Sequence, residues 1–148
     1  MFKPKKILVP TDFSEHSAKA LERALDIAKQ NNSELIMLHV IQQDVQSCTV
    51  DYCFSEDEME RLEKSMLEGA KDLLHKELAR FPLAREVKIS TEVLQGVPYE
   101  EILKFQVQNS VDLIVIASHG RSGITKYFLG SVSSNVLKGA KCEVLLVK

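Results

Sequence analysis

Three of the six glycines of this chain, Gly120, Gly123 and Gly130, lie in one short segment. They follow residues 111–118 (VDLIVIAS), an apolar run that predicts a buried strand. Glycine lets the backbone adopt a positive φ and approach a ligand without an intervening Cβ. Gly130 and Ser131 also begin a predicted helix, whose first amide groups lack partners within the helix and attract anions. The spacing favours a loop that holds phosphate, and the alternative is a set of tight turns with a helix cap.

Polar side chains in the same segment could add to such a site. The hydroxyls of Ser131 and Ser133 could donate to a phosphate, and Arg121 and Lys126 could supply positive charge. The P-loop pattern GxxxxGK[ST] is absent, and no GxGxxG follows the first apolar run of the chain. If a nucleotide binds, we expect its phosphates at this later loop.

Side chains arranged for catalysis are harder to find. His119 lies in the glycine segment, where a histidine more often supplies a hydrogen bond than acid–base chemistry. Ser14 and His16 fall at a predicted helix start, where serine is typical of a cap. No pair of carboxylates is spaced to activate water, so we expect binding as the function.

Cysteine usage and charge narrow the class of protein. Cys48 and Cys53 could form a metal or redox pair, but no second pair or nearby histidine completes a zinc set. With Cys142 the cysteine count is odd, which indicates reduced thiols and a cytoplasmic protein. The net charge of −2 gives no reason to expect nucleic acid or an anionic membrane as a partner. No apolar run approaches the length of a membrane span.

The elements that must position these residues alternate along the chain. Apolar or alternating runs predict strands at residues 5–10, 34–40, 86–94, 111–118 and 142–148. Helical spacing predicts helices between them, beginning after Ser14, at the capping box that follows Ser55, at Pro98 and at Gly130. The long helix after Ser55 carries apolar residues at helical spacing, namely Met59, Leu62, Met66, Ala70, Leu73, Leu74 and Phe81.

This alternation predicts one doubly wound α/β domain over residues 1–148, a mostly parallel five-stranded sheet with helices on both faces. Ligands of such sheets bind beyond the carboxyl ends of the strands, where the strand order reverses. The strand ends carry Pro10-Thr11-Asp12, His39-Val40 and Ser118-His119-Gly120. We therefore expect a ligand site at this edge.

Two stretches of the chain resemble the universal stress protein (UspA-like) family. Residues 7–21 (ILVPTDFSEHSAKAL) resemble its opening strand and helix, and residues 113–148 resemble its closing third. The nucleotide-binding branch of that family is described by G-x2-G-x9-G-[ST]. Gly120 with Gly130-Ser131 matches the second half, whereas Ala117 stands at the first glycine. The resemblance implies the sheet order 3-2-1-4-5, which places strands one and four side by side.

The resemblance also implies a site for ATP, with Mg²⁺ bound through the phosphates. Pro10, Thr11, Asp12 and Val40 would lie beside adenine and ribose. The residues that would line the ribose and hold the phosphates come from the closing segment: Ile116, Ala117, His119, Gly120, Arg121, Gly130, Ser131, Val132 and Ser133. It implies an ATP-binding module of the stress response. The alternatives are a nucleotide-independent dimeric interaction protein and a slow ATP hydrolase.

The last predicted strand suggests a protein partner. Val144, Leu145, Leu146 and Val147 are apolar, yet the implied order places them at a sheet edge, where unpaired backbone invites another chain. Universal stress protein domains often dimerise there, so the resemblance implies a homodimer. The alternative is an edge covered by the chain's own helices.

Overall fold

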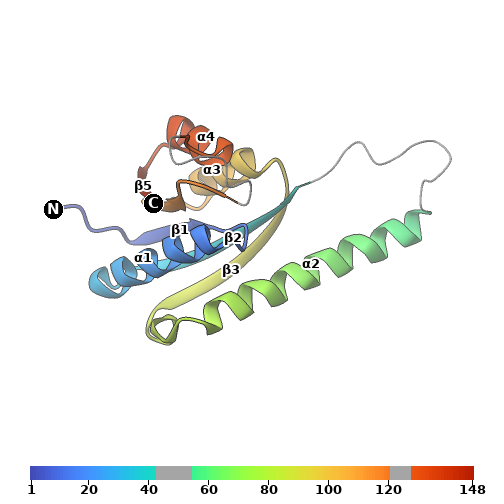
Figure 1. Ribbon diagram of the computed structural model, residues 1–148, viewed down its shortest axis with the longest axis horizontal. Helices are drawn as coiled ribbons and strands as arrows, with labels where there is room; N and C mark the ends of the chain where they lie inside the picture. The colour runs from blue at the N-terminus through green and yellow to red at the C-terminus, as the bar shows by residue number, and fades with distance from the viewer. Residues whose placement is uncertain (43–54, 121–127) are drawn as a thin grey trace.

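The sheet is parallel throughout and follows the predicted order. The computed structural model describes residues 1–42, 55–120 and 128–148. Five strands form one sheet in the order β3-β2-β1-β4-β5, with every neighbouring pair parallel. Figure 1 shows β1, β2 and β3 of this sheet side by side. Their bounds are β1 Lys6–Pro10, β2 Glu34–Gln42, β3 Lys88–Gly96, β4 Leu113–Ala117 and β5 Glu143–Val147. The predicted fold class is confirmed.

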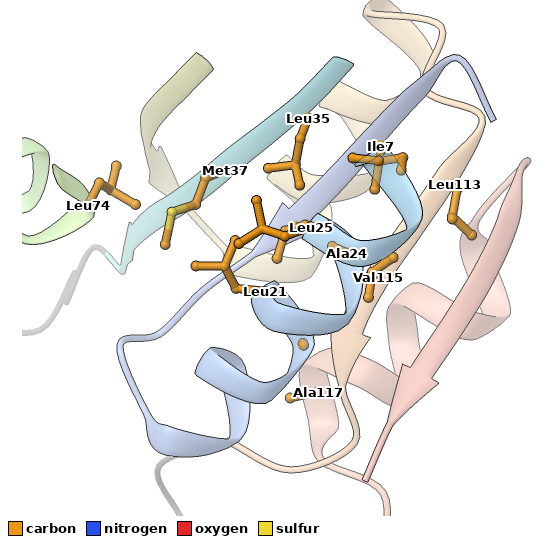
Figure 2. Packing of buried hydrophobic residues seen from close by; sticks show 13 residues of the cluster. Ile7, Leu21, Ala24, Leu25, Leu35, Met37, Leu74, Leu113, Val115 and Ala117 are labelled. Carbon is orange, nitrogen blue, oxygen red and sulfur yellow. The ribbon is translucent and has the colours of Figure 1, made fainter. Parts of the chain in front are cut away.

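Four helices cover the two faces of this sheet. They are α1 (Glu15–Asn31), α2 (Glu56–Ala79), α3 (Pro98–Gln108) and α4 (Ser131–Gly139). Buried residues of α1 and α2 pack with one set of strand residues, and those of α3 and α4 pack with the other set. Figure 2 shows the first cluster, where Leu21 and Leu25 of α1 lie among strand residues and Leu74 enters from α2.

Alternation along β1 explains how one short strand serves both layers. Ile7 and Val9 belong to the cluster beneath α1, whereas Leu8 belongs to the cluster beneath α3. All three are fully buried. Successive side chains of a strand point to opposite faces, so a continuous apolar run is what a doubly covered strand requires. The edge strand β3 has one exposed row that includes Ser90 and Glu92.

Local signals place the helix ends. The Ser14 side chain accepts the Ser17 N–H at the start of α1, and Asn32 ends that helix in the left-handed conformation. Ser55 and Glu58 form the predicted capping box of α2. A short 3-10 helix, Pro82–Glu86, follows α2 and was not predicted. No helix in the described residues combines the length and apolarity needed to cross a membrane.

The apolar residues predicted along α2 are only partly buried. Ala70 and Leu74 are buried, but Met59, Leu62, Met66 and Leu73 are each 40–46% exposed. Helical spacing correctly indicated a helix here. It did not reveal that four of these apolar side chains stay largely exposed within the described residues.

Candidate functional site

A cavity of about 510 Å³ opens at the carboxyl ends of the central strands. Residues at the ends of β1, β2 and β4 line it, and the strand order reverses between β1 and β4. Every predicted site residue that the structure describes lines it: Pro10, Thr11, Asp12, Val40, Ile116, Ala117, His119, Gly120, Gly130, Ser131, Val132 and Ser133. Arg121, Gly123 and Lys126 lie outside the described residues.

The turn after β1 is fixed by hydrogen bonds of its own side chains. Thr11 Oγ1 accepts the Phe13 N–H at 3.0 Å and lies 3.0 Å from Ser17 Oγ, while the Thr11 N–H donates to Leu38 O. Asp12 Oδ1 accepts the Ser14 N–H at 3.0 Å. Thr11 is buried, so its hydroxyl serves the turn, and the Asp12 carboxylate is oriented before any ligand arrives.

Phe13, the next residue of this turn, has an unfavourable backbone conformation. Its φ of 64° lies in the left-handed region, which is unfavourable for a bulky residue. Its ring lies 4.5 Å from the ring of His39, and His39 Nδ1 lies 2.8 Å from Thr11 O. A carbonyl only accepts, so Nδ1 carries the proton. These contacts hold His39 of β2 against the turn after β1.

Gly120 meets the same turn from β4. A Cβ at this position would lie 2.7 Å from Asp12 Oδ2, closer than a side chain tolerates. The absence of a side chain therefore lets the carboxylate rest against the backbone that follows β4. This contact joins the ends of β1 and β4 across the cavity.

Gly130 connects the loop after β4 to the start of α4. It is the N-cap residue, and its N–H donates to Ser118 O at 2.9 Å. The Ser133 hydroxyl donates to Ala117 O at 2.5 Å, so this proton is already used within the chain. The first turn of α4 is thereby held at the end of β4, where it lines the cavity and brings the partial positive charge of a helix N-terminus.

One ring nitrogen of His119 is buried and has no partner among the described residues. Its Nδ1 lies 2.9 Å from Ser118 Oγ, and its ring centroid lies 5.9 Å from that of His16. Its Nε2 makes no hydrogen bond to any residue that the structure describes. A buried polar atom left unsatisfied is costly, so a ligand oxygen that reached Nε2 would remove a penalty.

Several lining residues were not predicted from the sequence: Ser17, Leu38, Ile41, Gln42, Pro98 and Ile102. His39, at the carboxyl end of the second predicted strand, also lines the cavity. Pro98 and Ile102 come from the first turns of α3. No local signal places that helix over β2, because the contact depends on the crossover from β3.

Three described groups outside the cavity lining, Arg80, Tyr99 and Cys142, have a shifted pKa. Hydrogen bonds to Glu15 and Glu77 raise the pKa of Arg80, which ties α2 to α1. Burial raises the pKa of the Cys142 thiol, and a hydrogen bond to Glu100 raises that of Tyr99. These shifts follow from packing and surface pairing outside the site.

Comparison with known proteins identifies the family. The model of the universal stress protein family matches residues 3–148, and this chain belongs to that family. Universal stress protein MJ0531 of Methanocaldococcus jannaschii is 36% identical over 97% of this chain and 82% of its own length. The solved structure of MJ0577 from the same organism is 32% identical, with a TM-score of 0.83 over 99% of this chain and 97% of that one.

A further solved structure carries a ligand. It is a universal stress protein in complex with cAMP, 24% identical to this chain, with a TM-score of 0.72 over 99% of this chain and 98% of that one. At this identity the likeness shows the shared fold. The confirmed family and fold agree with what the two motif-bearing stretches implied.

Proposed function

We propose that this chain is an ATP-binding regulatory module of the stress response, acting in the cytoplasm. The observation that carries the proposal is convergence. Polar and glycine residues from the ends of three strands, β1, β2 and β4, line one cavity, whose volume is typical of small-molecule sites. The cAMP complex of a protein with the same fold supports an adenine nucleotide as the ligand class.

The cavity offers different surroundings to the two ends of a nucleotide. Val40, Ile102 and Ile116 give it an apolar part that suits a flat base. The N-terminus of α4, with Gly130 and Ser131, suits phosphates because its amides point outward without helical partners. Bound ATP would bring its own Mg²⁺, held through the phosphates. Ala117, at the position of a family glycine, adds one methyl group to this lining.

Binding is the proposed activity, and turnover is the alternative. Among the described residues that line the cavity, Asp12 is the only carboxylate, so water activation by a carboxylate pair lacks its second member. Slow ATP hydrolysis that disappears in both His119→Ala and Asp12→Ala would favour the enzyme. Binding without measurable release of ADP supports the regulatory module.

The deciding experiment is calorimetric titration of ATP with Mg²⁺ into protein stripped of bound nucleotide. Gly130→Val should weaken binding at least tenfold, because the added bulk occupies the phosphate end. The φ of −58° at Gly130 is open to any residue, so the variant should fold, which circular dichroism can check. Ala79→Val, on the exposed end of α2, adds similar bulk and should bind like the parent. No binding by the parent would favour the nucleotide-independent interaction protein.

We also propose a homodimer through β5. This strand pairs with β4 on one side and has no strand on its other side within the described residues. Val144 and Leu146 pack against one core cluster, and Leu145 and Val147 pack against the other. Its side chains thus serve both layers of the fold, and its open backbone edge is the part available to a second copy.

A further inference from the structure

The exposed side of α2 carries an apolar stripe with regular spacing. Met59, Leu62, Met66 and Leu73 lie at intervals of three, four and seven residues, which is the spacing of a coiled-coil seam. We call these four residues, with Gly69 between the last two, the α2 stripe. Each of the four large side chains is 40–46% exposed. In Figure 1, α2 runs beside β3 and its N-terminal part extends beyond the strands.

Gly69 is unexplained by the fold of this chain. A glycine inside a helix is destabilising relative to alanine. A Cβ at Gly69 would meet nothing within 4 Å, so no contact of the described chain requires the glycine. It lies on the stripe, where the absence of a side chain would allow another backbone to approach closely.

The charges beside the stripe select its partner. In the heptad register of the stripe, the exposed flanking positions hold three acidic residues, Glu58, Glu63 and Asp72, and one serine, Ser65. A second copy of α2 would bring the same acidic residues and be repelled, whether parallel or antiparallel. We propose that the α2 stripe docks an amphipathic helix of a partner protein whose apolar seam is flanked by lysine or arginine.

The probe for this proposal is a labelled synthetic helical peptide with leucine at the a and d positions and lysine at e and g. Fluorescence anisotropy with the full chain at physiological salt should give saturable micromolar binding. A matched peptide with glutamate at e and g should bind at least tenfold more weakly. Leu62→Asp and Met66→Asp should each lower affinity at least tenfold, while Val107→Asp, on the exposed side of α3, should not.

Two substitutions that change the net charge equally distinguish docking on the stripe from a general electrostatic attraction of the peptide to the protein. Glu63→Lys, beside the stripe, should weaken binding of the lysine peptide, whereas Glu68→Lys, on the far side of α2, should leave it close to the parent value. Gly69→Leu should also weaken binding without loss of fold by circular dichroism. Equal binding of both peptides, equal effects of the paired variants, or no saturable binding would overturn the proposal. So would sedimentation showing a self-association that Leu62→Asp abolishes, because the occupant would then be a second copy.

Discussion

At the scale of single residues, the Asp12 carboxylate and the backbone of Gly120 lie in contact between β1 and β4. Asp12 is oriented by the Ser14 N–H, and a Cβ at Gly120 would come within 2.7 Å of its other carboxylate oxygen. The site geometry thus depends on the carboxylate of Asp12 and on the lack of a side chain at Gly120.

Gly120→Ala should lower both stability and affinity for ATP. The new methyl group must displace the carboxylate. We therefore expect a loss of about 1–2 kcal/mol in the free energy of unfolding and an affinity for ATP that is at least tenfold lower. Urea unfolding and calorimetry measure the two effects. In the double variant with Asp12→Ala the clash is gone, so the stability losses should fall short of additive. Additive losses would show that the contact has no energetic consequence.

His119 offers a test that separates its two ring nitrogens. Asparagine can retain the polar contact made by Nδ1 with Ser118 but has no atom at Nε2, whereas glutamine reaches toward the Nε2 position. We expect His119→Asn to weaken ATP binding several-fold and His119→Gln to stay near the parent, as measured by calorimetry. If both variants bind equally well, the buried Nε2 does not contact the nucleotide.

At the scale of elements, the sequence predicted what depends on local chemistry. Ser14 and Ser55 marked helix starts because their side chains accept amides of the first turn, and the apolar run of β4 marked a doubly covered strand. The cavity lining from Pro98 and Ile102 escaped prediction because it depends on a crossover between β3 and α3. For α2, the spacing of apolar residues predicted a helix with an apolar face. The spacing could not show which of these side chains are buried, because that depends on how far the helix extends beyond the sheet.

Gly69 allows a prediction for α2 alone. Gly69→Ala should raise the free energy of unfolding by about 1 kcal/mol, because alanine favours the helix and its methyl group meets nothing within 4 Å. Urea denaturation measures the change. Ala79→Gly, near the exposed end of the same helix, provides the reverse substitution and should destabilise. A destabilising Gly69→Ala would mean that an unseen constraint requires glycine within this chain.

At the scale of the whole molecule, the sheet has two edges with different character. Along β3 one row of side chains is exposed and polar, which discourages pairing with another chain, whereas β5 is apolar after Glu143. The cavity lies near the middle of the sheet, between β2 and β4, while α2 and β5 lie on opposite sides of it. Nucleotide, homodimer and helical partner would therefore use separate surfaces.

The direction of backbone groups along β5 gives the sharpest test of the homodimer. Val147 O accepts the Ser118 N–H at 2.8 Å, so Val147 faces β4, and by alternation the N–H of Leu146 faces the open edge. Leu146→Pro removes that outward donor without removing a bond to β4, and proline is tolerated at sheet edges.

Light scattering at micromolar concentration should show twice the monomer mass for the parent and the monomer mass for Leu146→Pro. Leu146→Ala keeps the N–H while losing packing in the cluster beneath α3, so it should remain dimeric. A monomeric parent would contradict pairing through β5. Loss of the dimer in both variants would instead assign the interface to the Leu146 side chain, which would place the second copy against a face of the sheet.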